Sequence, residues 1–181
     1  IAHGHDAMSC DLLPTEAPGP HYQGNVRDVL HQGWDMMIAH PPCTYLSVSG
    51  MHWTTRGLRD PQLTEDALAF VKLLMDAPIP RIAVENPVSV ISSRIRKPDQ
   101  VIQPWWFGDD ASKKTCLWLK GLPLLTETNR LPGDGSTRRA NQTASGQNRL
   151  PPGPDRQRER SRTYQGIANA MAAQWGAFIE N

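Results

Sequence analysis

Cys43 and Glu85 are the two side chains of this sequence best suited to shared covalent chemistry. Cys43 follows two prolines, and Glu85 begins the run Glu85-Asn86-Pro87. A thiol can add to an electron-poor ring while a neighbouring carboxylic acid protonates a ring nitrogen. The prolines restrict the backbone that presents the thiol. We therefore predict a nucleophile at Cys43 with Glu85 as its acid, the alternatives being an inert buried thiol and a structural acid at a strand end.

Two short apolar runs must bring these side chains together. Segments 35–39 and 81–85 both have the character of buried strands, and each is closed by a proline-containing turn. Between them, apolar residues recur at helical spacing over 64–76, after a start signal at Asp60-Pro61. Strand, helix and strand in this order predict a βαβ unit with parallel strands. Ligands bind outside the carboxyl ends of such strands, so we expect Cys43 and Glu85 to face one crevice.

Weaker patterns predict the remaining elements. A short buried strand over 7–11 ends in Asp11, a helical turn covers 26–30, and a third strand covers 115–119. A final helix over 166–178 carries apolar residues on one face, namely Ile167, Met171, Trp175 and Phe178.

Composition narrows the class of protein. A chain of 181 residues with 39% hydrophobic residues is typical of one globular domain with a core. Its three cysteines are widely spaced and odd in number, which favours a reducing, cytoplasmic setting over a disulfide framework. No apolar run approaches the roughly 20 residues of a membrane span. The chain opens on Ile1 without a Met, and we expect further residues before it.

Positive charge is concentrated near the carboxyl end of the chain. Segment 126–163 has eight Arg against four acidic residues, a net of +4, although the whole chain carries only +1. Such a stretch can hold a phosphate backbone. The alternative is a solvated loop. The candidate nucleic-acid contacts are Arg156, Arg158, Arg160 and Arg162.

Four motifs, in this order, resemble cytosine-C5 DNA methyltransferases, in particular small members of phage or prophage type. Pro41-Pro42-Cys43 is similar to their Pro-Cys nucleophile loop, and Glu85-Asn86-Pro87 to their Glu-Asn-Val motif. Segment 107–119 resembles their Tyr-Gly-x-Pro-Gln-x-Arg-x-Arg stretch and the strand after it. Asn169-Ala170-Met171 is similar to their Gly-Asn-Ala/Ser-Val motif.

This resemblance implies a fold and a division of the chain. The fold would be α/β, a Rossmann-like S-adenosylmethionine-dependent methyltransferase with a mostly parallel sheet, its N-terminal strand lying before this chain. Residues 1–125 would form the catalytic core, and 126–163 an Arg-rich loop or reduced target-recognition segment. Residues 164–181 would form a C-terminal helix packing back on the core.

The resemblance also implies a reaction. Cys43 would add to carbon 6 of a cytosine flipped out of DNA, with Glu85 assisting at N3, and carbon 5 would take a methyl group from S-adenosylmethionine. Asn86 would orient the loop, and Lys113 would retain a cation of the family's Arg motif. The residues implied in cofactor binding are Asp11, Asn25, Pro41 and Asn169.

Other interpretations stay open. The glycine-rich loop that wraps the cofactor in this family has no counterpart in this sequence, so the chain could be a catalytically silent relative that binds nucleic acid. It could also be a fragment completed by preceding residues, by another chain or as a homodimer. Structural roles remain for Asp11, Asn25, Lys113 and Asn169. His3, His5 and Cys10 lack the spacing of a metal site, so we expect no metal. We expect DNA as the partner and no association with a membrane.

Overall fold

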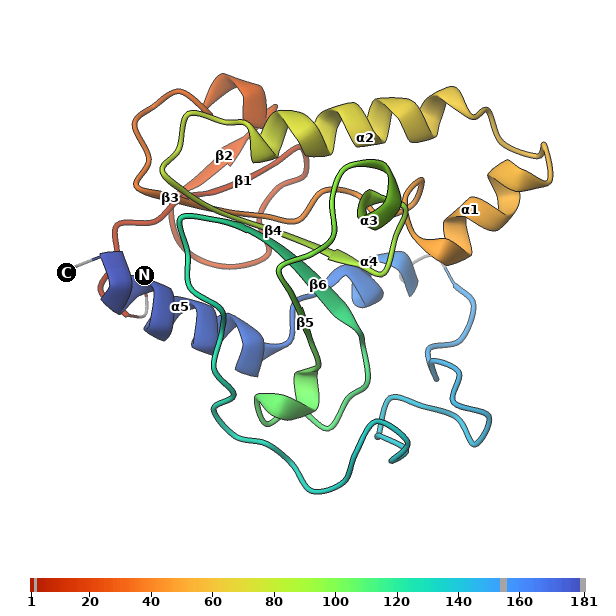
Figure 1. The fold of residues 1–181 in the computed structure, drawn as a ribbon. Coiled ribbons are helices and arrows are strands. Elements are labelled where there is room, and N and C mark those ends of the chain that lie inside the picture. Colours follow the sequence, from red (N-terminus) through yellow and green to blue (C-terminus); the bar gives the residue numbers. More distant parts are fainter. Residues whose placement is uncertain (2, 154–155, 180–181) are drawn as a thin grey trace.

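A computed structural model describes residues 1, 3–153 and 156–179 (Figure 1). The strands are β1 (Ser9–Asp11), β2 (His21–Gln23), β3 (Met36–Ala39), β4 (Arg81–Pro87), β5 (Gln100–Ile102) and β6 (Thr115–Lys120). The helices are α1 (Val48–Thr55), α2 (Gln62–Met75), α3 (Ile91–Arg94), α4 (Arg156–Ser161) and α5 (Gln165–Ile179). Two 3-10 turns are η1 (Val26–Asp28) and η2 (Pro104–Trp106). None of these helices, within the described ranges, is long and apolar enough to cross a membrane.

The main sheet has four strands in the order β3-β4-β6-β5. β3 and β4 are parallel, with Met36 opposite Arg81 and Ala39 opposite Val84. Helix α2 makes the connection between them, starting at Gln62, where the backbone N–H donates to the Asp60 carboxylate at 2.9 Å. The parallel pairing and the intervening helix expected from the sequence are therefore confirmed.

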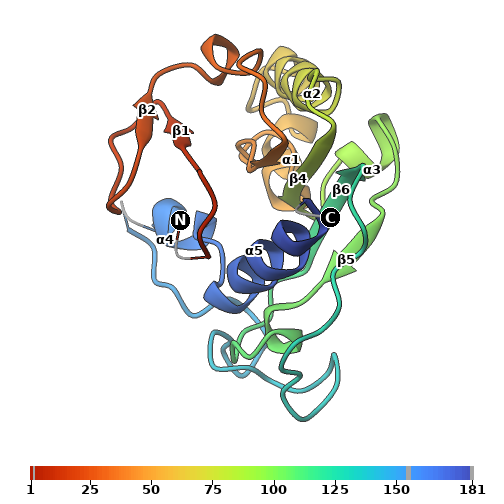
Figure 2. The same ribbon diagram turned by 90° about the vertical axis from the view of Figure 1, so that its left-hand side faces the viewer.

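The expectation of a mostly parallel, Rossmann-like sheet is wrong. β6 runs antiparallel to both β4 and β5, which leaves one parallel pair in the main sheet and makes the fold mixed α/β. Segment 103–114 explains this, since it holds only the short turn η2 and reverses the chain from β5 into β6. A parallel connection needs a longer crossover, usually through a helix. β1 and β2 form a separate parallel pair, which lies apart from the main sheet in Figure 2.

Two helices cover opposite faces of the main sheet. Because side chains alternate across a strand, neighbouring residues of β4 enter different cores. Val84 packs with Val71 and Leu74 of α2, whereas Ala83 packs in the cluster that contains Met171 of α5. Figure 1 shows the two helices on either side of the sheet.

The expected final helix and third strand are confirmed with small changes of boundary. On α5, Ile167, Met171 and Trp175 are buried as the spacing predicts. Phe178 is instead 46% exposed, and its ring lies 5.8 Å from the Arg81 guanidinium carbon. The buried strand expected over 7–11 is shorter and is not buried, as β1 begins at Ser9 and both Ser9 and Asp11 are exposed.

The stability of the core under α2 should depend on Leu74. Leu74 is 2% exposed, whereas Leu63 on the same helix is 37% exposed. Replacing Leu74 with Ala removes buried methyl groups and leaves a cavity, so urea unfolding should show a loss of about 2–5 kcal/mol. Leu63→Ala is the matched control and should cost less than about 1 kcal/mol. Equal losses for the two variants would contradict this packing.

Candidate active site at the ends of β3 and β4

The carboxyl ends of β3 and β4 bring two polar pairs together. When the register of the two strands continues by one residue beyond Ala39 and Val84, His40 falls beside Glu85. The two side chains meet there, with His40 Nδ1 2.9 Å from Glu85 Oε2. The Glu85 side chain is 11% exposed and that of His40 41%. No role for His40 was predicted from the sequence, although its place one residue beyond the strand was the available signal.

Asn86 joins β4 to the loop that carries the cysteine. Its side chain is buried, and Nδ2 donates to the carbonyl oxygen of Pro41 at 2.8 Å. This is the oxygen of the residue two positions before Cys43. The other amide atom, Asn86 Oδ1, is buried and has no hydrogen-bond partner among the described residues. A buried acceptor without a hydrogen-bond partner costs about 1–3 kcal/mol of stability. A ligand that donated a hydrogen bond to Asn86 Oδ1 would remove this cost.

Hydrogen bonds within the turn close the backbone around Cys43. The Cys43 carbonyl accepts hydrogen bonds from the backbone N–H groups of Leu46 at 3.1 Å and Ser47 at 2.9 Å. Ser47 then caps α1, its hydroxyl accepting from the Gly50 N–H at 3.2 Å. Because these bonds close the turn, the half-buried Cys43 has a defined backbone position.

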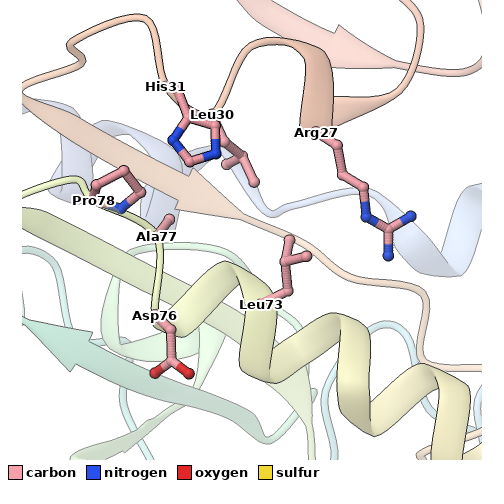
Figure 3. Close-up of a pocket in the computed structure, with 7 residues that line it drawn as sticks. All are labelled: Arg27, Leu30, His31, Leu73, Asp76, Ala77 and Pro78. Atoms are coloured by element: carbon pink, nitrogen blue, oxygen red, sulfur yellow. The ribbon is translucent and has the colours of Figure 1, made fainter.

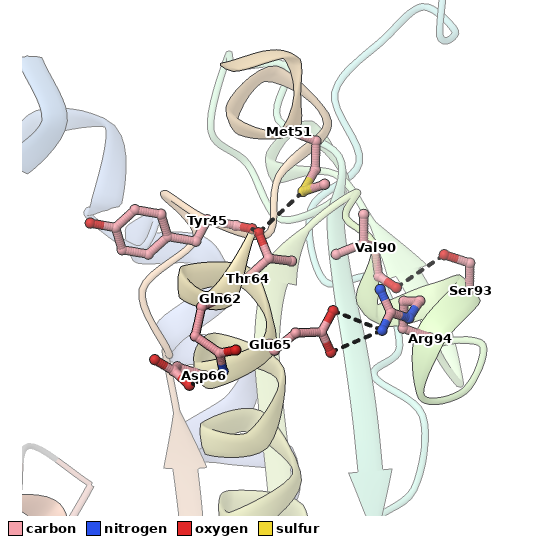
Figure 4. Close-up of polar contacts among 9 residues, drawn as sticks. All are labelled: Tyr45, Met51, Gln62, Thr64, Glu65, Asp66, Val90, Ser93 and Arg94. Carbon is pink, nitrogen blue, oxygen red and sulfur yellow. Dashed lines mark hydrogen bonds and ion pairs between the residues drawn. The ribbon is translucent and has the colours of Figure 1, made fainter. Parts of the chain in front are cut away.

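Side chains from later in the chain fix the next two carbonyls. Arg59 Nη1 donates to the Thr44 carbonyl at 2.9 Å. Thr64, buried on α2, donates its hydroxyl to the Tyr45 carbonyl at 3.1 Å (Figure 4). The Arg59 guanidinium also lies over the Tyr45 ring, 4.9 Å from its centre. The loop is thus held from α2 and from the segment before it.

The segment after β4 holds the far end of the loop. The Val90 backbone N–H donates to the carbonyl of Leu46, whose side chain is fully buried. Val90 precedes α3, and α3 is joined to α2 by an ion pair in which Arg94 Nη2 lies 2.9 Å from Glu65 Oε1 (Figure 4). The loop, α2 and α3 therefore form one connected support.

The other two cysteines are held as thiols. Burial raises the pKa of Cys116, and the negative charge of Glu85 raises it further, while Lys114 lowers it. Burial also raises the pKa of Cys10, with Asp11 adding to the effect. The thiolate is the nucleophilic form, so neither environment favours reaction.

Lys113 lies at the same end of the sheet but is directed toward the C-terminal segment. It precedes β6, whose first residue Thr115 pairs with Pro87 at the end of β4. Its Nζ donates to the Arg162 carbonyl at 3.4 Å and lies 6.0 Å from the centre of the Tyr164 ring. Lys113 therefore has a bonding partner away from Glu85.

The residues implied in cofactor binding make local contacts. Asp11 Oδ1 accepts from the Leu13 N–H at 2.9 Å, and Asn25 caps η1 by accepting from the Arg27 N–H at 3.0 Å. Asn169 is exposed on α5, where it accepts from Gln165 one turn earlier. Of the four, Pro41 is the one bonded to the Cys43 site, through Asn86.

Among the described residues, these hydrogen bonds do not join Asp11, Asn25 or Asn169 to the Cys43 loop. Asp11 belongs to the separate β1–β2 sheet, so the backbone pairing of the main sheet does not place it beside β3.

Over residues 1, 3–153 and 156–179, no group of three or more His, Cys, Asp and Glu side chains could hold a metal ion.

A hollow of about 380 Å³ lies at the other end of β3 and β4 from the candidate site. Its walls include Leu30 and His31, which come before β3, and Ala77 and Pro78, which come just before β4 (Figure 3). It therefore lies toward the amino ends of the two parallel strands. The chemistry-bearing side chains lie at their carboxyl ends, so this hollow is not part of the candidate site.

The arginines predicted to contact nucleic acid divide into two pairs. Arg158 and Arg162 form ion pairs with Glu16, at 3.2 Å and 2.9 Å. Arg160 is exposed, and Arg156 is half-buried at the start of α4. Glu16 thus offsets part of the charge that the sequence concentrates here.

Two other arginines of the Arg-rich segment have a packing role. The guanidinium carbons of Arg130 and Arg139 each lie 4.5 Å from the centre of the Trp105 ring. The Arg139 side chain is buried, with one ion-pair contact to Asp110 at 3.7 Å. These contacts with Trp105 join the Arg-rich segment, residues 126–163, to η2.

Gly50 gives a prediction for the Cys43 loop. A Cβ at this position would overlap the Thr44 carbonyl oxygen, which is backbone and already bonded to Arg59. Gly50→Ala should lower stability by about 1–3 kcal/mol and raise amide hydrogen exchange over residues 43–51. Gly135→Ala is the control, since a Cβ there meets nothing within 4 Å. Unchanged exchange in Gly50→Ala would show that the loop is not held as described.

Comparison of this chain with models of protein families, with characterised proteins and with solved structures finds no match to any of them.

Proposed function

We propose that this chain acts on cytosine in DNA as a C5-methyltransferase-like enzyme, with Cys43 and Glu85 as its reacting groups. The hydrogen bond from Asn86 to the Pro41 carbonyl carries the proposal, because it joins the Pro-Pro-Cys loop to the Glu-Asn-Pro segment at one end of the sheet. The proposal rests on this site and not on a Rossmann-like sheet. The same chemistry recurs on different folds, so the antiparallel β6 does not exclude it.

The addition step uses the two side chains in complementary roles. The Cys43 thiolate forms a bond to carbon 6 of the cytosine ring, and the electron pair displaced from the carbon 5–carbon 6 double bond moves through the ring toward N3. Glu85, when protonated, gives its proton to N3 and so stabilises the adduct. General acid assistance of this kind contributes about 10²-fold to 10⁴-fold in rate. Carbon 5 is then electron-rich and ready to take an electrophile.

The fixed loop supports this chemistry by holding the thiol in place. Bonds to the carbonyls of Pro41, Thr44 and Tyr45 hold the backbone on both sides of Cys43 before any substrate arrives. Orientation of a nucleophile in advance removes part of the entropic barrier to addition. The base must leave the duplex to reach the thiol, because carbon 6 is covered by its stacked neighbours.

S-adenosylmethionine is the methyl donor that the sequence resemblance implies, and it would supply the methyl group for carbon 5. The side chains of Asp11, Asn25 and Asn169 make hydrogen bonds to residues two to four positions away. The steps above therefore use the chain's own residues alone.

Covalent trapping tests the proposal. DNA containing 5-fluorocytosine should form a stable adduct with the protein in the presence of S-adenosylmethionine. Once carbon 5 has taken a methyl group, fluorine stands where a proton would be lost, so the thiol cannot be eliminated. Cys43→Ser should abolish the adduct, and Cys10→Ser should retain it, which mass spectrometry of the tryptic peptides will show. An absent adduct in the unaltered protein would overturn the proposal and leave a silent DNA-binding relative.

Salt dependence tests whether the Arg-rich segment contacts DNA. Replacing Arg156 and Arg160 with Gln should weaken duplex binding and reduce the slope of log affinity against log salt by about 2, one unit for each lost phosphate contact. The control replaces Lys72 of α2 and Arg96, which follows α3, each ion-paired with a carboxylate. A similar slope change in both double variants would rule out a specific contact by α4.

A further inference from the structure

His40 makes a contact at this site that the proposed reaction leaves unused. Its Nδ1 atom lies 2.9 Å from Glu85 Oε2. The ring is 41% exposed, whereas the carboxyl group it meets is 11% exposed. His40 is therefore the more exposed member of this pair, and it lies three residues before Cys43.

We propose that His40 is a positioning residue for Glu85, donating its Nδ1–H to Oε2 so that Oε1 is the oxygen presented to the base. This inference rests on the proposed function and deepens it. The terminal torsion of a glutamate is broad, so a carboxyl group bonded on neither oxygen rotates freely. A donor on Oε2 fixes the plane of the group. Oε1 makes no hydrogen bond within the described part of the chain, which leaves it open toward a ligand.

The backbone explains why His40 can do this with little freedom of its own. The parallel register of β3 and β4 places it next to Glu85, so the sheet sets the distance between them. His40 also precedes Pro41, and the residue before a proline is restricted to extended conformations. The Pro41 carbonyl is held in turn by Asn86. The backbone of His40 is thus fixed by strand pairing before it and by the bonded Pro41 after it, as a preorganised site requires.

The tautomer of the ring follows from its partner. When Glu85 carries the proton for N3 on Oε1, Oε2 has only lone pairs to offer, so in this role Nδ1 carries the ring proton and Nε2 is the acceptor. Around the carboxylate, Cys43 is on the same loop as His40, and β6 contributes Cys116, whose pKa is raised by burial and then by Glu85 itself. No hydrogen bond joins Cys116 to Glu85 among the described residues, whereas His40 Nδ1 lies 2.9 Å from Oε2.

Two variants of His40 test the role through the rate of adduct formation on 5-fluorocytosine DNA. His40→Ala removes the donor and should slow adduct formation at saturating DNA by about 10-fold to 100-fold, a part of the full general-acid contribution. DNA affinity should change little, because the effect falls on the reacting complex and not on binding. His40→Asn places an amide N–H near the former Nδ1 and should restore the rate to within about threefold. His31→Asn, an exposed histidine at the other end of β3 and β4, is the control.

Each outcome decides the role. A slow Ala variant rescued by Asn supports positioning by a hydrogen-bond donor. An Ala variant as fast as the unaltered protein overturns it and leaves the proposed function standing. Ala and Asn variants that are equally slow also overturn it, because a donor alone would then be insufficient. If the unaltered protein forms no adduct, the proposed function fails and the catalytic role of His40 fails with it.

Nitrogen NMR of the His40 ring tests the hydrogen bond without any activity. The unaltered protein should show the Nδ1–H tautomer. Glu85→Ala should return the ring to the Nε2–H tautomer that free histidine favours, because the acceptor is gone. An Nε2–H tautomer in the unaltered protein would overturn the inference even where His40→Ala has failed to fold.

Discussion

The parallel pairing of β3 with β4 is the constraint on which the candidate site depends, because it determines which side chains face each other at the strand ends. Beyond Ala39 and Val84, the same register puts His40 beside Glu85, and the next residues are joined by the hydrogen bond from Asn86 to Pro41. The pairing itself follows from α2, which packs its apolar face on the sheet and returns the chain in the same direction. Without this crossover the thiol loop and the acid would leave the sheet at opposite ends.

Two polar side chains at this end of the sheet, Glu85 and Asn86, are buried, and their hydrogen bonds show which of their atoms have a partner within the protein. Asn86 is buried, and among the residues that the structure describes its Nδ2 has a partner and its Oδ1 has none, while Glu85 is bonded through Oε2. The loop carbonyls of Thr44 and Tyr45 are satisfied by Arg59 and Thr64. Asn86 Oδ1 is a buried acceptor without a partner among the described residues, and Glu85 Oε1 makes no hydrogen bond to them. An arrangement of this kind suits a ligand that brings hydrogen-bond donors, as a cytosine protonated at N3 would.

Local pattern was sufficient for part of the fold and for part of the site. Segments 35–39 and 81–85, with the helix between them, were predictable because apolar runs and helical spacing are visible in single segments. The mostly parallel sheet was wrong because the direction of β6 depends on the reversal at η2, and β5 has only three residues, too few for a pattern. His40 was missed because its role arises from register with a segment 45 residues away. The contacts of Asp11 and Asn25 are short-range turns and caps, which a motif does not distinguish from ligand contacts.

Exchange of the carbon-5 hydrogen of cytosine is the most direct measure of whether Cys43 and Glu85 act together. Addition of the thiolate at carbon 6 makes carbon 5 able to take a proton from water, and reversal of the addition then releases the original hydrogen, so no methyl donor is needed. DNA labelled with tritium at carbon 5 should release it to water when mixed with the protein alone, and Cys43→Ser and Glu85→Gln should each reduce the release strongly. No release from the unaltered protein, or equal release from Cys43→Ser, would contradict the account.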